Sequence, residues 1–317
     1  MTKLLLDYVK DAKTIGISGH IHPDGDCIGS VLSCYMYLKN ALPLATIHAY
    51  AESVSNSFTM LSRVEELDTS YSFPEEPYDV FISLDCGSID RLGRCQDEFL
   101  RAKRTVSFDH HITNTNFADE NIVNAAASST SEVLFDHMER ELIDLPIAEA
   151  LYLGIMHDTG VFKYSCTSEK TMCTVGYLMS KGIDTASLVD KSFYMKSFIQ
   201  LKTLGCALSK AELGLGGKMI YTILTQEDIA KIGARMTDTE GIVSELRTTE
   251  GVEAAVFIRE EAPGIYKFSL RSNGLVDVST ISSSFGGGGH KMAAGFTAEG
   301  SLDEIFTQVS AMIMLQI

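Results

Sequence analysis

The chain has 317 residues, which exceeds the usual size of one domain and predicts two, each with a hydrophobic core of its own. Hydrophobic residues make up 45% and charged residues 21%, and no apolar run is long enough to cross a bilayer, so we expect a cytoplasmic protein without membrane association. A formal net charge of −16 at pH 7 argues against salt-driven binding to long nucleic acid, but not against a small anionic substrate met by bound cations.

The first half of the chain alternates short apolar runs with longer amphipathic ones, which is typical of strands and helices in turn. Strands are expected at 14–18, 46–50, 80–85 and 105–109. Helices are expected at 27–40, 130–141, 146–158 and 168–181. This order favours a parallel sheet with helices on both faces, in which ligands gather at the carboxyl edge of the strands.

A long helix is expected over residues 190–212, and it would join the first half to a second, smaller α/β domain. Strands of that second domain are expected at 218–225, 252–260, 266–272 and 293–298, and helices at 226–234, 241–248 and 302–315. The predicted organisation is therefore a domain of residues 1–190, a helical linker at 191–212 and a domain of residues 213–317. We expect the active-site cleft between the two domains.

Polar side chains follow the first predicted strand in the segment GHIHPDGDCIGS, residues 19–30. His20 stands at the end of the strand, and Asp24 and Asp26 lie in a Pro-Gly turn where both carboxylates can face one centre. Carboxylates with an imidazole suit cations such as Mg²⁺ and Mn²⁺. The alternative is that the two aspartates only start the turn and cap the helix that follows.

Further clusters of the same kind stand at other predicted strand and helix ends. Asp85 closes the third strand, Asp109, His110 and His111 close the fourth, and Asp158 ends an apolar helix. If the two histidines point to opposite sides, one can bind a metal ion while the other faces a substrate. Each cluster taken singly is also explained by turn residues, caps or loop histidines. Together they favour a metal site, because four acidic element ends in one half-chain would otherwise be coincidental.

The segment SSTSEV, residues 128–133, predicts a helix start. Ser129 or Thr130 would be the N-cap, and Glu132 would lie in the first turn. The amide end of that helix could receive a phosphate, but a plain N-cap explains the same string.

With these motifs, the chain resembles the DHH phosphoesterase family over nearly its whole length. The resemblance implies two divalent ions, usually Mn²⁺, with Mg²⁺ or another divalent ion as the alternative. One ion would be held by His20, Asp24 and Asp85, and the other by Asp26, Asp85, His110 and Asp158, so that Asp85 bridges them. By the same resemblance Asp109 orients the histidine pair and His111 contacts a substrate phosphate or transfers a proton, so both count with Asp85 as catalytic.

Two motifs of the second half, SLRSN at 269–273 and FGGGGHKMAAGF at 285–296, resemble the domain that accompanies this family. Consecutive glycines let backbone amides approach an anion without obstruction, and an arginine can bind phosphate through two parallel hydrogen bonds. A flexible linker is the alternative explanation of the glycine run. The resemblance makes the substrate contacts Arg271, Gly288, Gly289 and His290.

The function that the resemblance implies is hydrolysis of RNA fragments of two to a few nucleotides, or of linear dinucleotides such as pApA, to mononucleotides. Similarity to the NrnA-like oligoribonucleases also implies removal of a phosphate from 3′-phosphoadenosine 5′-phosphate (pAp). The nucleophile would be a water activated by the two ions and not a side chain. A RecJ-like exonuclease for longer single strands, an inorganic pyrophosphatase and a non-catalytic nucleotide sensor are the alternatives, and a homodimer is left open.

Overall fold

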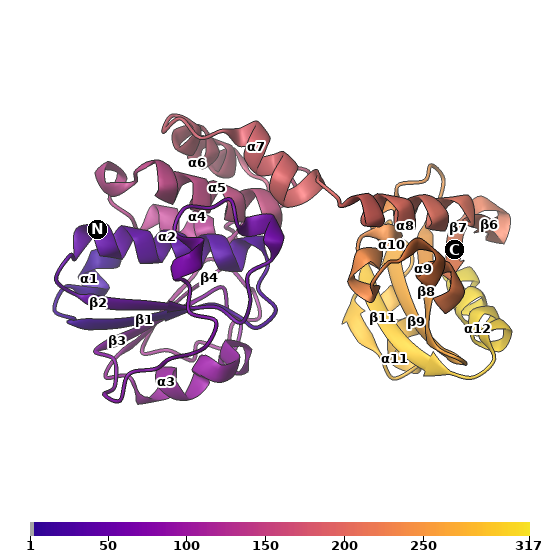
Figure 1. Ribbon diagram of the computed structural model, residues 1–317, viewed down its shortest axis with the longest axis horizontal. Helices are drawn as coiled ribbons and strands as arrows, with labels where there is room; N and C mark the ends of the chain where they lie inside the picture. Colours follow the sequence, from indigo (N-terminus) through magenta and orange to yellow (C-terminus); the bar gives the residue numbers. More distant parts are fainter. Residues whose placement is uncertain (1–2) are drawn as a thin grey trace. The chain divides into compact units, whose positions relative to one another are not determined.

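The computed structural model describes residues 3–317, and the chain divides into two units, one reaching to Met195 and one formed by Lys196–Ile317. Each unit is built on one β-sheet and has a hydrophobic core of its own (Figure 1). Among the described residues, no helix has the length and apolar character that a membrane crossing requires.

The sheet of the first unit has five strands, all parallel, in the order β2-β1-β3-β4-β5. Its strands are β1 Thr14–Ser18, β2 Thr46–Tyr50, β3 Val80–Leu84, β4 Thr105–Asp109 and β5 Glu120–Val123. The side chains of β3 and β4 are buried along their whole length, because both faces of the sheet are covered. The four predicted strands are confirmed. The edge strand β5 was not predicted, since its four half-buried residues show neither an apolar run nor an alternating pattern.

Helices cover both faces of this sheet, as predicted (Figure 1). They are α1 Leu5–Val9, α2 Gly25–Ala41, α3 Gln96–Arg101, α4 Thr130–Asp136, α5 Leu145–Asp158, α6 Glu169–Met179 and α7 Thr185–Val189. α2, α4 and α5 bury the larger core on one face, while α3 packs its Phe99 against Phe81 on the other. The helix expected to reach residue 141 ends at Asp136, and the Arg140 guanidinium donates to the carbonyl of Phe135 in its last turn.

The close packing of α2, α4 and α5 depends on Gly154. A Cβ atom at Gly154 would lie 2.0 Å from Ser131 Oγ and 2.7 Å from a carboxylate oxygen of Asp26. Since no side chain fits there, the N-terminus of α4 and the first turn of α2 can meet against α5. This packing brings Asp26 to the carboxyl edge of the sheet.

The second unit has a six-stranded mixed sheet in the order β10-β11-β9-β8-β7-β6, in which only β7 and β8 run parallel. Its strands are β6 Glu212–Gly214, β7 Met219–Leu224, β8 Ala254–Ala262, β9 Ile265–Ser272, β10 Gly288–His290 and β11 Ala293–Glu299. Its helices are α8 Phe198–Ser209, α9 Gln226–Ile232, α10 Ile242–Arg247, α11 Val278–Ser284 and α12 Leu302–Met314. The strands and helices predicted for this half are all present.

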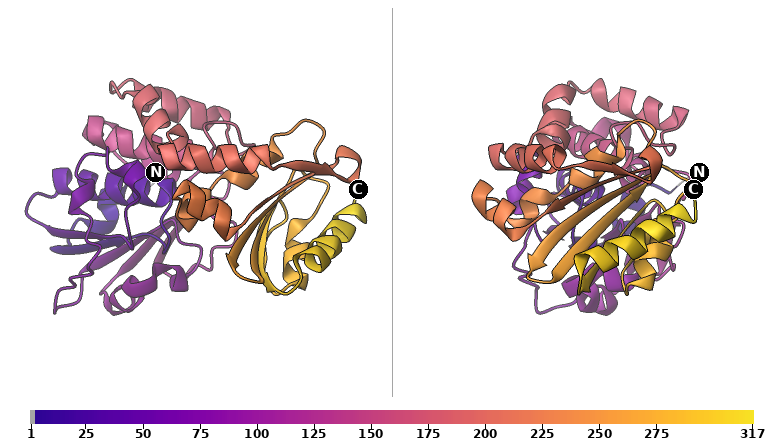
Figure 2. Two further views of the ribbon diagram at one scale, coloured as in Figure 1. Left: turned by 45° about the vertical axis from the view of Figure 1, so that its right-hand side comes forward. Right: turned by 90° about the vertical axis from the view of Figure 1, so that its right-hand side faces the viewer.

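The two faces of this second sheet are covered unequally. α11 and α12 pack against one face and bury residues such as Phe268 and Phe296, and Figure 2 shows the yellow α12 along that side of the sheet. α8, α9 and α10 cover the opposite face only around β7 and β8, where Ile220 and Phe257 are buried. The same face of β9, β10 and β11 carries half-buried or exposed residues and is left open.

The single helix predicted over residues 190–212 is wrong. A π-helical turn at Asp190–Tyr194 ends before Met195, and α8 begins anew at Phe198. Ser197 caps α8 by accepting the amide of Gln200, and the Gln200 side chain accepts the amide of Ser197 in return. This capping box is the local reason for a second helix start.

Candidate active site

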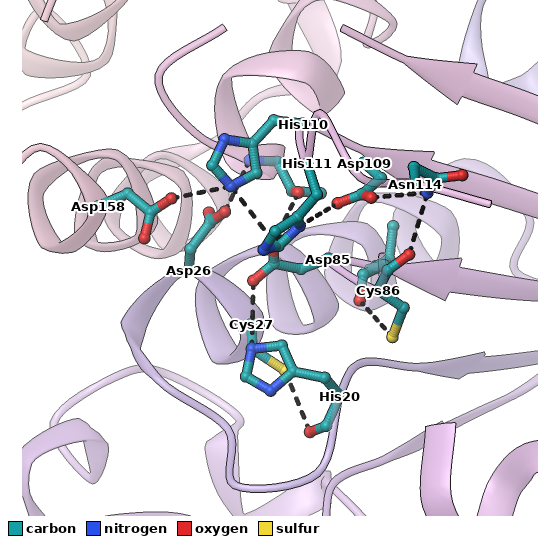
Figure 3. A network of polar contacts seen from close by, with 12 residues as sticks. His20, Asp26, Cys27, Asp85, Cys86, Asp109, His110, His111, Asn114 and Asp158 are labelled. Carbon is teal, nitrogen blue, oxygen red and sulfur yellow. Dashed lines mark hydrogen bonds and ion pairs between the residues drawn. The ribbon is translucent and has the colours of Figure 1, made fainter. Parts of the chain in front are cut away.

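The Asp and His residues singled out in the first half converge at the carboxyl edge of the first sheet (Figure 3). They come from the ends of β1, β3 and β4, from the start of α2 and from the end of α5. The residues brought together are His20, Asp24, Asp26, Asp85, Asp109, His110, His111 and Asp158. Residues separated by more than a hundred positions in the sequence therefore share one site.

Asp85 lies at the centre of the site and is only 3% exposed. One carboxylate oxygen lies 3.4 Å from His20 Nε2, and the other lies 3.7 Å from both His110 Nε2 and His111 Nδ1. Thr130 Oγ1 donates a hydrogen bond of 2.9 Å to that second oxygen. The backbone of Asp85 is left-handed, with φ of 59°, a conformation that surrounding contacts must hold in place.

His20 and Asp24 form the first group with Asp85. His20 Nδ1 donates to the carbonyl of Ile21 at 2.8 Å, which leaves Nε2 to face Asp85 and, at 3.7 Å, Asp24 Oδ1. The same Asp24 oxygen accepts the amides of Asp26 and Cys27, each at 3.1 Å, and caps α2. The two explanations offered for Asp24, helix cap and site residue, are therefore compatible in one side chain.

Asp26, His110 and Asp158 form the second group (Figure 3). His110 Nε2 lies 3.1 Å from a carboxylate oxygen of Asp158. The fully buried Asp26 accepts the amides of Thr130 at 2.6 Å and Ser131 at 3.0 Å, which are the first-turn amides of α4. Of the two explanations of the segment 128–133, the structure supports the plain N-cap, because Ser129 caps α4 and the Asp26 carboxylate already occupies the amides that a phosphate would need.

Asp109 is buried beneath His111 and fixes its ring. His111 Nδ1 donates to one oxygen of Asp109 at 2.7 Å, and Asn114 Nδ2 donates to the other at 2.6 Å. These contacts lower the pKa of Asp109 against the effect of its burial. The hydrogen bond to Asp109 in turn raises the pKa of His111 above the usual value. With Nδ1 engaged, Nε2 is the ring atom of His111 left for a substrate.

The sequence suggested that the two adjacent histidines could point to opposite sides, but they do not. Their ring centroids lie 4.8 Å apart at an interplanar angle of 61°, and both rings reach the same oxygen of Asp85. The division of labour between them is set by their second contacts, Asp158 for His110 and Asp109 for His111.

Negative charge from carboxylates predominates among the side chains of the site. Burial disfavours charge on His20, but its contacts with Asp24 and Asp85 outweigh this and raise the pKa of His20 to about 10. The carboxylates around His110 likewise overcome its burial and raise the pKa of His110 to about 10. Burial and repulsion from Asp85 raise the pKa of Asp26 well above the usual range. A site that draws protons onto its imidazoles and carboxylates in this way is one that a cation would stabilise.

The donor set fits divalent metal ions. In the described part of the chain, three groups have ligand atoms that lie within 4.8 Å of one another. These groups are His20, Asp24 and Asp85; Asp26, His110 and Asp158; and Asp85, His110 and His111. Carboxylate oxygens mixed with imidazole nitrogens suit Mg²⁺ and Mn²⁺ better than they suit a structural zinc site.

The open face of the second sheet carries the other predicted residues. Directly paired residues of neighbouring strands share a face, so Arg271, Ala293 and His290 form one row across β9, β11 and β10. Ser269, Gly295 and Gly288 form the adjacent row. Arg271 and His290 thus lie beside a row of small residues, and the small side chains leave room for a ligand to lie against the strands.

Gly289 stands apart from this face. It pairs with Ala294, one step out of the row, and its φ of 142° is unfavourable for a residue with a side chain. The glycine run is not a free loop, because Gly288–His290 form an edge strand that pairs, among the strands of the described residues, with β11 alone. Such an edge keeps outward backbone groups available to a ligand.

A cavity of about 490 Å³ lies beside the same face, within the second unit. Arg271, Lys267 and Arg259 line it from the strands, and Glu240 and Met236 line it from the segment before α10. The Arg259 guanidinium is held by the carbonyl of Met236 at 2.9 Å and by Glu261 at 2.7 Å, so its position is fixed by the fold.

Four polar residues of the first site were not singled out for it from the sequence. Thr130 and Ser131 hold Asp85 and Asp26, Asn114 holds Asp109, and Arg91 contacts the segment that carries His20. A helix cap was predicted at Ser129 or Thr130, and Ser129 is the N-cap, so a signal existed beside Thr130, but the partner of Thr130, 104 positions away in the chain, was not visible. Asn114 stands in a loop and Arg91 in a short 3₁₀ segment, and neither stretch of sequence carries a comparable signal.

Comparison with known proteins matches each half of the chain to a known domain family. The profile of the DHH family, N-terminal domain, matches residues 14–155, and the profile of the DHHA1 domain matches residues 216–314.

Several known proteins are similar to this chain along most of their length. The bifunctional oligoribonuclease and PAP phosphatase NrnA of Thermus thermophilus is 30% identical over 308 residues, which cover 93% of this chain and 87% of that protein. The probable NrnA of Streptococcus mutans is 26% identical over 297 residues, 92% of each chain. Among solved structures, an exopolyphosphatase-related protein from Bacteroides fragilis is similar with a TM-score of 0.86 and 26% identity, covering 97% of this chain and 93% of that one.

Proposed function

The chain belongs to the DHH family, and from that premise we propose that it is a metal-dependent phosphodiesterase that hydrolyses short oligoribonucleotides to mononucleotides. Linear dinucleotides such as pApA are included among its substrates, and pAp is converted to AMP. Relatives named oligoribonuclease and PAP phosphatase, aligned over most of the chain, support this choice of substrates.

The observation that carries the proposal is the convergence of carboxylates and imidazoles on Asp85. Asp85 faces His20 with one oxygen and both His110 and His111 with the other, so it belongs to two of the three candidate metal groups. A nucleotide sensor without turnover would have no need of a buried carboxylate shared in this way.

We assign two divalent ions, with Mn²⁺ as the preferred metal, to this site. One would be held by His20, Asp24 and Asp85, and the other by Asp26, Asp85, His110 and Asp158. When bound, the pair would supply an activated water and would stabilise the oxygens that attack and leave in an in-line displacement.

Asp109 and His111 supply the proton transfer in this proposal. Because Asp109 holds Nδ1 and raises the pKa of His111, the ring carries its second proton on Nε2 more of the time than a free histidine would. From Nε2 it donates a hydrogen bond to a phosphate oxygen, or a proton to the leaving oxygen, as a general acid. Asn114 keeps Asp109 from turning away.

The second unit anchors the substrate. Arg271 binds a phosphate of the nucleotide that is not being attacked, His290 contacts it in the same row, and the backbone at Gly288 and Gly289 approaches it at the strand edge. Catalysis is thus assigned to residues 1–190, substrate binding to residues 213–317, and the connection to residues 191–212.

The experiment that tests the proposal measures mononucleotide release from pApA, pAp and RNA of two to six nucleotides, in the presence of Mn²⁺ and of excess EDTA. We expect release with Mn²⁺ and none with EDTA. Tight binding of these nucleotides without release under any divalent cation would overturn the proposal in favour of a sensor.

A further inference from the structure

We propose that Arg91 binds the phosphate group that is hydrolysed, as the cation of a subsite completed by the hydroxyls of Ser88, Thr113 and Thr115. The inference rests on the proposed function, since it names a further substrate contact of the same site. It assigns the first unit a phosphate-binding group of its own, distinct from Arg271 in the second.

Arg91 is built into the wall of the site. It lies in the 3₁₀ segment Ile89–Cys95 that follows β3, and its backbone carbonyl accepts the amide of Ile21 at 2.8 Å. Its guanidinium Nη2 donates to the carbonyl of Ile21 at 3.2 Å and lies 3.3 Å from His20 Nδ1. Since the other ring nitrogen of His20 faces Asp85, the guanidinium lies only one imidazole ring away from the candidate metal ligands.

The charge of Arg91 is available to a ligand. In the described part of the chain it forms no ion pair with a carboxylate, whereas Arg63 and Arg101 are each paired with a glutamate. Its contact with the Ile21 carbonyl fixes the guanidinium without neutralising it. Among the described residues this half-buried cation lies next to a cluster of carboxylates without pairing with them, so its charge can still be balanced by a bound anion.

The space in front of Arg91 is suited to a phosphate. A cavity of about 440 Å³ is lined by Arg91 together with His20, Asp85 and His111. Arg91 is the one Lys or Arg among the described residues that line it, and Ser88, Thr113 and Thr115 bring hydroxyl groups. A ligand in this cavity therefore touches metal ligands, the candidate acid and a guanidinium at once.

The chemistry calls for such a group. Negative charge is spread over the phosphate oxygens during displacement, and a fixed guanidinium donates to these oxygens in a planar, forked geometry that a lysine does not reproduce. The hydroxyls can donate to the remaining oxygens. Beside the proposed divalent ions, Arg91 adds a fixed positive charge at the wall of a cavity that Asp24 and Asp85 also line.

The test compares Arg91→Gln with Arg94→Gln. Arg94 lies in the same 3₁₀ segment but is exposed, stacks over Tyr71 with its guanidinium 4.5 Å from the ring, and does not line the cavity. With Mn²⁺ present, kcat/KM is measured on pApA and on bis(p-nitrophenyl) phosphate, a diester with a single phosphate. We expect Arg91→Gln to lower kcat/KM roughly 100-fold on both substrates and Arg94→Gln to leave it unchanged. Arg91→Lys retains part of the rate, and added guanidinium partly restores Arg91→Ala.

Two binding measurements separate substrate contact from a structural role. By calorimetry, Arg91→Gln should bind Mn²⁺ like the wild type but bind inorganic phosphate, in the presence of Mn²⁺, at least about tenfold more weakly. If Arg91→Gln loses affinity for Mn²⁺, Arg91 acts by positioning His20 and not by binding phosphate. If the rate falls on pApA but not on bis(p-nitrophenyl) phosphate, Arg91 contacts a second phosphate of the substrate and not the one that is hydrolysed. Either result, or unchanged phosphate binding, overturns the inference. If the wild type hydrolyses neither substrate, the proposed function fails while the phosphate measurement still decides the role of Arg91.

Discussion

The two polar regions of this protein are built in opposite ways. At the carboxyl edge of the first sheet, buried carboxylates are each held by neighbours, as Asp26 is by two amides and Asp109 by His111 and Asn114. On the second sheet, Arg271 and His290 border a row of small residues on β9, β10 and β11, beyond the part of that face that α8, α9 and α10 cover around β7 and β8. The first region is suited to hold cations at fixed positions, and the second is suited to admit an anion of variable length.

This difference separates chemistry from binding. A change at the first region removes a group from the transition state and should act mainly on kcat, whereas a change at the second removes an anchoring contact and should act mainly on KM. Variants in each region can break or sharpen this division.

The largest effect is expected for Asp85→Ala. The substitution removes the carboxylate that faces His20, His110 and His111, so turnover of pApA should fall by at least about 1,000-fold. Initial rates with Mn²⁺ measure this. Asp90→Ala, an exposed residue a few positions further on, is the matched control and should retain activity. If Asp85→Ala turned over pApA like the wild type, Asp85 would not be a shared metal ligand. The division between a catalytic first region and a binding second region would then fail.

The sequence located this first region because its residues end regular elements. Strands β1, β3 and β4 were predicted within a residue of their observed bounds, and parallel strands present their carboxyl ends at one edge. The long-range partners could not be found in this way. Thr130 and Ser131 reach Asp26 only because Gly154 lets α4 pack closely, and a packing distance is not encoded in any local pattern.

The next effect is the pH dependence of metal binding. In the metal-free site the pKa values of His20 and His110 are raised to about 10, so both rings are protonated at neutral pH and must lose a proton to bind a metal. Raising the pH reduces that cost, so Mn²⁺ affinity should rise by about tenfold or more per pH unit between pH 6 and 8.

Calorimetry at pH 6, 7 and 8, in buffers of different ionisation enthalpy, gives both the affinity and the number of protons released. Arg271→Ala is the matched control, because a change on the second sheet should alter neither quantity. Mn²⁺ affinity that does not vary across this pH range would mean that these histidines are not ligands.

A smaller effect is expected for Arg271→Ala. Loss of its guanidinium removes an anchoring contact on the second sheet, so KM for pApA should rise roughly tenfold while kcat changes little. Steady-state kinetics separates the two constants. Lys231→Ala, on the exposed side of α9 and paired with Glu227, is a control that removes a positive charge elsewhere in the same unit. A fall in kcat at constant KM would place Arg271 in the chemistry and erase the contrast between the regions.

The second region shows more clearly what the sequence could not give. A flexible linker was the alternative explanation of the glycine run, because glycine favours no regular structure, yet Gly288–His290 pair with β11 as an edge strand. What permits the pairing is the small residues opposite, Ala293 and Gly295, whose register depends on the whole sheet. The serine-rich helix α11 was missed for a related reason, since its start depends on Asp277 accepting the amides of Ser279 and Thr280.

The smallest effect is expected for Gly288→Ala. A Cβ atom there meets nothing within 4 Å, so the fold is unaffected and Tm should stay the same. The added methyl group would stand in the row beside Gly295 and obstruct a ligand that lies against the strand, so KM for pApA should rise roughly threefold without a change in kcat. Gly289→Ala is the contrasting variant, because its Cβ atom would lie 2.5 Å from the carbonyl oxygen of Ala293 and should lower Tm. If Gly288→Ala left KM unchanged, the edge strand would frame the binding face without touching the substrate, and anchoring would rest on Arg271 and His290 alone.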